Sequence, residues 1–253
     1  MIVGYFAEIG PIGEKLDENH QFSRNERLGK DQTMRTKKSA AAFAFLVLLA
    51  GGVQVFGQQG KIQVEAWEVR INDRQPIAKV IEVMGVRPGM VIGEVGAGTG
   101  RVTVWLADAV GPKGLIYAID IDAEALDHLR KRCLREGLEN VQTIVGTVTD
   151  PKLPQNALDI AFMTNTYHHL EKPVELVRNL LTTLKGNGRL VIVERDYDRS
   201  VHKDEATTRE DFIKQMDQAG FKVVSIDTSM QEDNIYVCLP KERSESHGSF
   251  ASR

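Results

Sequence analysis

The residues best suited to chemistry form a glycine-rich turn. In the run Glu94-Val95-Gly96-Ala97-Gly98-Thr99-Gly100, glycine stands at every second position from 96 to 100. Glycine in such a turn lets the main chain bend sharply, and a ligand approaches the backbone without meeting a Cβ atom. A dinucleotide fingerprint would require its third glycine at position 101, where this chain has Arg101. The turn therefore predicts a small-ligand site and disfavours a nicotinamide cofactor.

An acidic residue follows at the distance that a nucleoside site requires. Asp120 comes directly after the apolar segment 115–119, about 20 residues beyond Gly100. A carboxylate at the end of a strand can accept hydrogen bonds from both ribose hydroxyls. The glycine turn and Asp120 together predict a nucleoside-binding site.

Both features need a parallel sheet to position them, and strand and helix patterns alternate along most of the chain. Apolar runs indicate seven strands, at residues 90–95, 115–119, 141–145, 158–163, 190–193, 223–226 and 235–239. Apolar residues at helical spacing indicate helices between them, at residues 77–84, 100–110, 126–136, 174–184 and 209–219. This alternation predicts an α/β fold, a doubly wound sheet with helices on both faces and ligands outside the carboxyl ends of the strands.

From about Gln75 to Leu239 the sequence resembles the class I S-adenosylmethionine-dependent methyltransferases. The segment 94–100 is similar to the first motif of that family, and Asp120 matches its ribose-binding acid. Similar matches to the fourth-strand motif and to the turn and strand after it lie in residues 158–163, 165–170 and 184–190. The resemblance implies S-adenosyl-L-methionine as the cofactor and a Rossmann-like sheet of about seven strands whose last strand is antiparallel.

One position departs from the family pattern. Many members carry an aspartate directly after the third-strand glycine to bind the adenine amino group, whereas Thr147 follows Gly146 here. Either backbone groups around Thr147 read adenine, or Asp150 reaches it through a loop that bends back. The resemblance also places Asn165, after the fourth strand, in the cofactor site.

The first motif implies contacts with the methionyl part of the cofactor. Glu94 is expected to accept a hydrogen bond from the methionyl ammonium group, directly or through water. The alternative for Glu94 is to cap the neighbouring helix terminus. Arg101 is expected to pair with the methionyl carboxylate, and its alternative is a solvated side chain in the first turn of a helix.

Two histidines are the candidates for catalysis. Transfer from a sulfonium centre mainly requires the acceptor to be held in line with the methyl–sulfur bond. Where the acceptor also loses a proton, a general base helps, and His168 or His169 at the carboxyl end of the fourth strand can supply one. The alternative is that one of these rings packs under the substrate loop and the other faces solvent.

Composition excludes several classes of protein. Lys and Arg number 32 against 35 Asp and Glu, so the net charge of −3 gives no positive field for a duplex nucleic acid. Two cysteines, Cys133 and Cys238, are expected to be buried thiols, not a disulfide scaffold or a zinc site. No metal is expected either. Acidic residues at 194, 196 and 198 follow the fifth strand, but no aspartate stands at the matching end of the fourth.

A segment before the sheet has the composition of a targeting signal. Met34 is followed by three basic residues, and the chain is then uncharged from 39 to 57. Its apolar part, residues 40–50, is shorter than the roughly 20 residues of a membrane span. We expect an exported protein (periplasmic, secreted or membrane-anchored) if Met34 is the true start, and otherwise a cytoplasmic one. A buried apolar helix is the alternative for this segment.

The expected divisions are a non-native or disordered extension at 1–33, a signal peptide or N-terminal anchor at 34–57, the methyltransferase-like domain at 58–240 and a disordered tail at 241–253.

Three functions follow from these patterns. The favoured one is methyl transfer to a small-molecule acceptor, whose specific contacts are expected from residues 67–74 and from the loops after the fourth and fifth strands. The second is methylation of a macromolecule, because residues 107–114 also resemble protein-carboxyl and tRNA methylating relatives, although the acidic charge disfavours RNA. The third is an exported nucleoside-binding protein of the same fold without chemistry, since S-adenosylmethionine is made in the cytosol.

Overall fold

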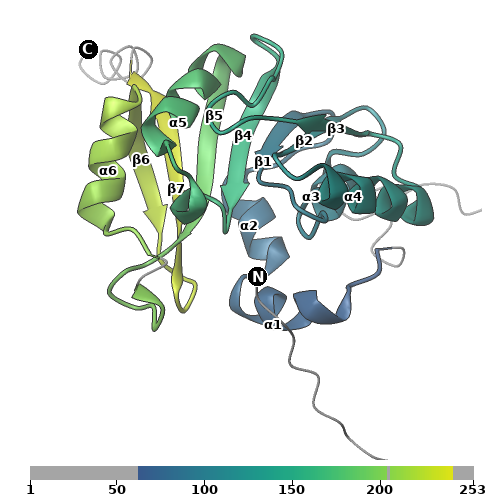
Figure 1. Ribbon diagram of the computed structural model, residues 1–253, viewed down its shortest axis with the longest axis horizontal. Coiled ribbons are helices and arrows are strands. Elements are labelled where there is room, and N and C mark those ends of the chain that lie inside the picture. The colour runs from purple at the N-terminus through teal and green to yellow at the C-terminus, as the bar shows by residue number, and fades with distance from the viewer. Residues whose placement is uncertain (1–61, 204–205, 242–253) are drawn as a thin grey trace, which may run out of the picture. The chain divides into compact units, whose positions relative to one another are not determined.

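A computed structural model describes residues 62–203 and 206–241 of the 253-residue chain (Figure 1). The expectations for residues 1–33, for the segment 34–57 and for the tail from residue 242 lie outside the described residues. Within the described ranges, no helix is both long enough and apolar enough to cross a membrane.

The described residues form a sheet of seven strands. In chain order the strands are β1 (Val91–Val95), β2 (Leu115–Asp120), β3 (Val141–Val145), β4 (Leu158–Thr164), β5 (Leu184–Arg195), β6 (Phe221–Asp227) and β7 (Asp233–Pro240). Their order across the sheet is β3-β2-β1-β4-β5-β7-β6. The pairs from β3 to β5 are parallel, and β7 is antiparallel to both β5 and β6. The Rossmann-like α/β fold with an antiparallel last strand is confirmed.

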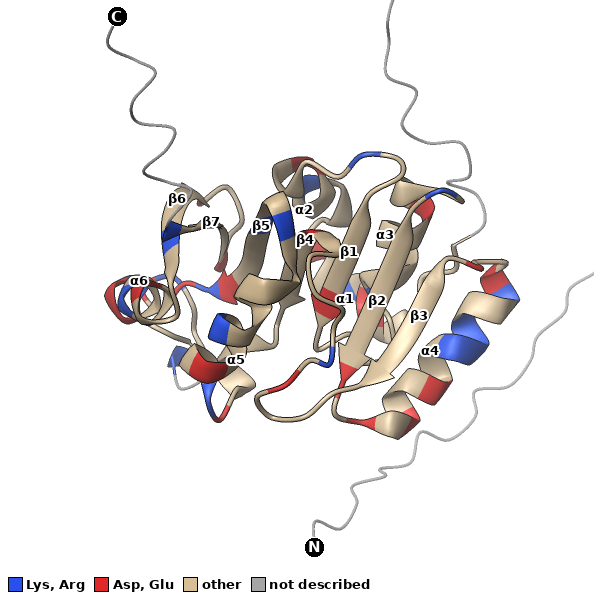
Figure 2. Ribbon diagram, turned by 90° about the horizontal axis from the view of Figure 1, so that it is seen from above, with Lys and Arg blue, Asp and Glu red and all other residues tan. Residues whose placement is uncertain are grey.

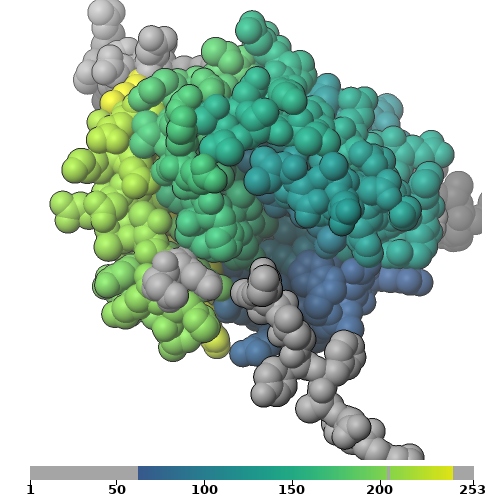
Figure 3. All heavy atoms as spheres, viewed as in Figure 1, coloured from purple at the N-terminus to yellow at the C-terminus, as the bar shows by residue number. Residues whose placement is uncertain are grey.

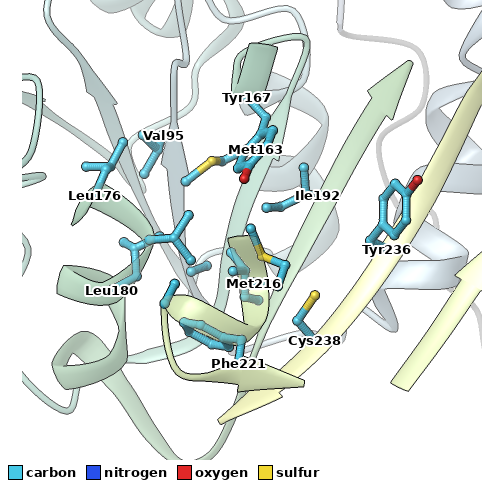
Figure 4. Packing of buried hydrophobic residues seen from close by; sticks show 14 of the residues in the cluster. Val95, Met163, Tyr167, Leu176, Leu180, Ile192, Met216, Phe221, Tyr236 and Cys238 are labelled. Atoms are coloured by element: carbon cyan, nitrogen blue, oxygen red, sulfur yellow. The ribbon is translucent and has the colours of Figure 1, made fainter. Parts of the chain in front are cut away.

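Helices cover both faces of this sheet. They are α1 (Ala66–Arg74), α2 (Ile77–Met84), α3 (Thr103–Val110), α4 (Ala123–Glu136), α5 (Pro173–Leu180) and α6 (Arg209–Gln218), with the 3-10 turns η1 (Tyr167–His169) and η2 (Leu181–Thr183). Apolar residues of α2, α3 and α4 pack on one face, and those of α5 and α6 pack on the other. Figure 4 shows the second cluster, where Leu176 and Leu180 of α5 and Met216 of α6 lie against Met163 and Ile192 of the strands. Both cysteines are free and buried, as expected.

Several element boundaries differ from those expected, and two of the differences have a clear physical reason. Helix α3 begins at Thr103 and not at Gly100, because Gly100 has a φ of +92°, outside the helical region. The turn expected before the fifth strand lies inside β5. There the β4–β5 register passes from Leu158–Leu184 directly to Ile160–Arg189, so residues 185–188 form a bulge.

The connection from β3 to β4 contains no helix. Residues 146–157 run as turns and irregular chain from one strand to the next. In Figure 2 this connection passes below the open ends of β2 and β3. The carboxyl ends of β1, β2 and β3 are therefore bordered by a loop on the side where α5 and α6 cover the rest of the sheet.

Helix α1 shows its apolar residues to solvent and buries a charged one. Trp67 is 48% exposed, whereas Glu68 has no exposed surface. Glu68 forms a buried ion pair with Arg132 of α4, and Arg132 Nε also donates to Glu136 Oε1 at 3.2 Å. These contacts hold α1 against α4. Helix α1 was not predicted, since its pattern is the reverse of an ordinary amphipathic helix.

Candidate active site

The three glycines of the turn after β1 serve different purposes. All three have positive φ angles, +76° at Gly96, +53° at Gly98 and +92° at Gly100. A Cβ atom at Gly96 would lie 2.1 Å from Thr166 Oγ1, and one at Gly100 would lie 2.2 Å from Leu129 Cδ1. Close packing against protein therefore requires the first and third glycines. Nothing lies within 4 Å of a Cβ at Gly98, so that position leaves open space beside the turn.

Asp120 joins the turn to the end of β2. Its Oδ2 accepts a hydrogen bond from Gly98 N at 2.8 Å, and its Oδ1 accepts one from Asp122 N at 3.0 Å. Asp122 in turn caps α4, because its Oδ1 accepts from Glu124 N at 2.8 Å. The expected carboxylate and glycine turn therefore lie together and fix each other's position.

A cavity of about 300 Å³ opens at this edge of the sheet. Five of the expected site residues line it, namely Gly96, Asp120, Thr147, Asn165 and His169. The remaining lining residues are Val95, Ile119, Ile121, Val148, Pro151, Thr166, Leu170, Glu171 and Leu176. The space-filling view shows a hollow between the green elements and the blue N-terminal helices (Figure 3), but no residue of those helices lines the cavity. The volume suits a small organic ligand.

Nine of the lining residues are not among the predicted site residues, and four of them illustrate what the sequence did not indicate. Ile121 is 67% exposed although apolar, and Val148 and Pro151 belong to the loop after β3. Glu171 lies between η1 and α5. The one signal in the sequence was Ile121, an apolar residue directly after the strand-end carboxylate. Apolar surface left in water commonly marks a binding site.

Glu94 lies in the middle of the sheet and is only 1% exposed. Its Oε2 accepts a hydrogen bond from the Thr103 hydroxyl at 2.6 Å, so it bonds to the first residue of α3. Burial removes water from the carboxylate and raises the pKa of Glu94 to about 7, while the Thr103 bond and the charge of Arg101 oppose that rise. A nearby cation would favour the ionised form. The expected contact with a methionyl ammonium group stays a prediction.

Arg101 is buried against α1 and does not line the cavity. The expectation of a solvated side chain is wrong, since Arg101 is 6% exposed. Its guanidinium donates to Asn72 Oδ1 at 3.0 Å, to Gln75 Oε1 at 2.8 Å and to Thr164 Oγ1 at 3.3 Å. Desolvation lowers its pKa, and the charge of Glu94 opposes this. Arg101 thus positions the chain around α1, and its pairing with a carboxylate of the cofactor stays a prediction.

Asn165 connects the same network to the cavity. Gln75 Nε2 donates to Asn165 Oδ1 at 2.8 Å, and Asn165 Nδ2 donates back to Gln75 Oε1 at 3.0 Å. Asn165 has a φ of +51°, a left-handed conformation that Asn tolerates better than most residues. Its side chain is held from behind by Gln75 while the residue lines the cavity.

The loop after β3 does bend back, but it does not bring the Asp150 side chain into the cavity lining. Thr147 N donates to Asp150 O at 2.8 Å, and Asp150 N donates to Thr147 Oγ1 at 3.0 Å. The Asp150 carboxylate accepts from Lys152 N at 2.7 Å. The idea that Asp150 reaches adenine is therefore not supported by its position, whereas Thr147 does line the cavity.

The two histidines lie at the end of β4 in different surroundings. His168 Nδ1 lies 2.7 Å from Glu194 Oε1, and both side chains are almost fully buried. The backbone N–H of His168 donates to Glu194 Oε2 at 3.2 Å. His169 is exposed and lines the cavity, with its ring centroid 4.1 Å from that of His168. Glu194 thus holds one of the two rings in place.

Two of the three acidic residues considered for a metal, Glu194 in β5 and Asp196 just after it, are engaged in other contacts. Glu194 holds His168, and Asp196 Oδ2 accepts from Asn234 Nδ2 at 2.7 Å and from Arg209 Nη2 at 3.2 Å. Within residues 62–203 and 206–241, no three His, Cys, Asp or Glu side chains gather where they could hold a metal ion.

Part of this chain is similar to known proteins. Residues 93–192, which include the turn, Asp120 and both histidines, match the family described as a methyltransferase domain. Over these residues the chain is similar to a methyltransferase domain. The ubiquinone/menaquinone biosynthesis C-methyltransferase of Ectopseudomonas mendocina (strain ymp) is 32% identical to it over 115 residues. Those residues are 45% of this chain and 45% of the relative, so the match spans less than half the length of either protein.

Solved structures agree with this similarity. A SAM dependent methyltransferase from Aquifex aeolicus superposes with a TM-score of 0.60 at 25% identity, covering 64% of this chain and 88% of that one. The [4+2]-cyclase SpnF superposes with a TM-score of 0.54 at 20% identity, covering 62% of each chain, and at that identity it shows the fold alone. The methyltransferase fold is therefore compatible with more than one chemistry.

The residues of the methyltransferase domain fit S-adenosyl-L-methionine, the cofactor of the family. Asp120 has a carboxylate at the strand end, where ribose hydroxyls would lie, and the open space at Gly98 would admit a ligand close to the backbone. Ile121 and Val148 offer apolar surface to a flat base. Buried Glu94 lies one residue before the start of the turn and suits a cationic group.

Proposed function

We propose that the chain is an S-adenosylmethionine-dependent methyltransferase that acts on a small-molecule acceptor. The observation that carries this proposal is the cavity of about 300 Å³, whose lining includes the ribose-type carboxylate Asp120 and His169 of the histidine turn η1. A relative named as a C-methyltransferase of ubiquinone/menaquinone biosynthesis favours a small acceptor over a macromolecule. The described part of the chain also lacks an added nucleic-acid-binding module.

S-adenosylmethionine supplies a methyl group on a sulfonium centre, which is already activated for displacement. The task left to the chain is to bind, to orient the acceptor and to take up a proton where the acceptor releases one. Glu194 supports a role of His168 in taking up that proton. A carboxylate only accepts, so Nδ1 of His168 carries the proton that is donated to Glu194, and Nε2 is the ring nitrogen with a free lone pair. We assign the general base to His168, which does not itself line the cavity but whose ring centroid lies 4.1 Å from that of His169, the histidine that does.

Calorimetric titration of the full chain tests the cofactor assignment. We expect S-adenosylmethionine and its demethylated product, S-adenosylhomocysteine, to bind at micromolar concentration, while NAD does not. Binding of NAD, or of none of the three ligands, would overturn the assignment. Binding of the first two without turnover on any acceptor would favour the non-catalytic nucleoside-binding alternative.

Turnover measurements test the assignment of His168 as the general base. Release of S-adenosylhomocysteine is measured with a panel of small phenols, enols and amines. On an acceptor that reacts, we expect His168→Ala to lower kcat by about 100-fold or more while the Kd for S-adenosylmethionine changes little. His169→Ala is expected to have a smaller effect. The control is His128→Ala, because His128 is exposed on α4 and does not line the cavity. Full activity in both His168→Ala and His169→Ala would remove the general-base role.

We also propose export of the chain through residues 34–57, on the basis of their charge order alone. N-terminal sequencing of protein from secreted and membrane fractions is the test. A start near Gln58 or at Met34 in those fractions supports export, and a start at Met1 in the cytosol contradicts it.

A further inference from the structure

Adenine recognition in this cavity needs a group that can accept a hydrogen bond. The exocyclic amino group of adenine is a donor, and no acidic residue follows the third strand at position 147. This inference rests on the proposed function, since it concerns the cofactor that the domain is proposed to use. It asks which residue of the cavity distinguishes adenine from other bases.

Most polar side chains of the cavity wall are already engaged within the protein. Both oxygens of Asp120 accept backbone N–H groups, and the Asn165 amide is paired with Gln75 through both of its ends. The Thr147 hydroxyl accepts from Asp150 N, and the Thr166 hydroxyl donates to Thr164 O at 2.9 Å. Among the lining residues, the two polar side chains that make no hydrogen bond or ion pair to the described residues are His169 and Glu171.

Position separates these two residues. His169 is adjacent to His168, so it lies on the side of the proposed base, where the acceptor is expected. Glu171 follows Leu170 and precedes α5, whose residue Leu176 also lines the cavity. Leu170 and Leu176 supply apolar surface beside Glu171, and a base needs such surface for its faces and a polar group at its edge. An ionised carboxylate accepts from an amino group more strongly than a neutral oxygen does.

We propose that Glu171 is the specificity-determining residue for adenine, and that its carboxylate accepts a hydrogen bond from the 6-amino group. The residue comes from the β4–α5 connection, whereas Thr147 comes from the β3–β4 loop, and both residues line the cavity. Replacement of the amino group by a carbonyl oxygen, as in hypoxanthine, places two acceptors opposite each other and weakens binding.

Calorimetric titration of the full chain with S-adenosylhomocysteine and S-inosylhomocysteine tests the proposal without any acceptor. We expect the unchanged protein to prefer the adenosyl ligand by about tenfold or more, the lower end of what a hydrogen bond to a charged group provides at an exposed site. Glu171→Gln is expected to reduce that preference to about threefold or less, because an amide both donates and accepts. Thermal melting verifies that the variant folds.

Two controls separate base recognition from general effects. Glu175→Gln removes the same charge one turn further on, from an exposed residue that pairs with Lys172 and does not line the cavity. Its preference for the adenosyl ligand is expected to stay unchanged. Asp120→Ala weakens both ligands by a similar factor, since they share the ribose, and leaves their ratio unchanged.

The outcomes distinguish this inference from the proposed function. A tenfold preference that persists in Glu171→Gln would overturn the role of Glu171 while leaving the cofactor assignment intact. Equal binding of the two ligands by the unchanged protein would do the same. If the unchanged protein bound neither ligand, the proposed function would fail and the inference would fail with it.

Discussion

The two sides of the carboxyl edge of the sheet are built by different means. On the cofactor side, the turn after β1 and the end of β2 are joined through a backbone N–H, which Gly98 donates to Asp120. On the other side, α1 and the residue that follows it are held by side chains distant in sequence. Gln75 and Asn165 are 90 residues apart, and Glu68 and Arg132 are 64 residues apart. The cofactor side is a local motif, whereas the α1 side is a network of long-range pairs.

The prediction with the largest expected effect concerns the buried ion pairs that hold α1 against α4. Arg132→Met would leave the carboxylates of Glu68 and Glu136 buried without their partner, and we expect a loss of about 3–5 kcal/mol in the free energy of unfolding. Urea denaturation measures it. The control is Arg130→Met, because Arg130 pairs with Asp127 on the exposed surface of α4, where an ion pair contributes about 1 kcal/mol or less. Equal losses in both variants would mean that the buried cluster does not hold α1.

The pH dependence of stability tests the buried carboxylate on the cofactor side. Folding raises the pKa of Glu94 from 4.5 to about 7, so the folded protein holds a proton that the unfolded chain releases between these values. Stability is therefore lost as pH rises from 4.5 to 7, by about 3 kcal/mol, and Glu94→Gln removes this loss. Urea denaturation at a series of pH values measures the difference between the proteins. Glu139→Gln, at an exposed position, is the control, and a pH profile for Glu94→Gln that matches the unchanged protein would contradict the prediction.

Cofactor affinity is expected to depend on one side chain of the local motif. Asp120→Ala removes a charged acceptor, and we expect binding of S-adenosylmethionine to weaken by about 1.5–3 kcal/mol, which is about 10- to 100-fold in Kd. Calorimetric titration measures it. Asp150→Ala is the matched control, because that carboxylate accepts from Lys152 N and does not line the cavity. Unchanged affinity in Asp120→Ala would show that the ribose is held elsewhere.

The prediction with the smallest expected effect tests whether the α1 side and the cofactor side are independent. Gln75→Met keeps the size of a buried side chain but removes the bonds to Arg101 and Asn165. We expect a loss of about 1–2 kcal/mol in the free energy of unfolding and a change in cofactor Kd of less than about threefold. Gln142→Met, at an exposed position in β3, is the control for stability. A large loss of affinity in Gln75→Met would show that α1 and the cofactor site act together.

The local character of the cofactor side explains how much of it could be predicted. The seven strands, the glycine turn and Asp120 follow from apolar runs and from residues close together in sequence. In the structure, positions 96 and 100 require glycine because a Cβ atom there would meet Thr166 or Leu129, which are distant in sequence. Spacing alone predicts the turn, but it does not show which glycine faces the ligand.

The α1 side could not be predicted for the same reason. Trp67 is exposed and Glu68 is buried, the reverse of what apolar periodicity assumes, because the partner of Glu68 is on α4. Arg101 has the residue type that suits a carboxylate ligand, but its donors are satisfied by Asn72, Gln75 and Thr164. A charged side chain near a motif is therefore weak evidence for ligand contact until its partners are known.

The position of β7 has a consequence for synthesis of the chain. β7 is the last of the seven strands to leave the ribosome, yet it lies between β5 and β6. Until residues 233–240 emerge, the long strand β5 has one unpaired edge, and β6 has no neighbour in the sheet. Unpaired edges of this kind recruit other chains. The nascent protein is therefore most prone to aggregation late in translation, after its cofactor side has already been made.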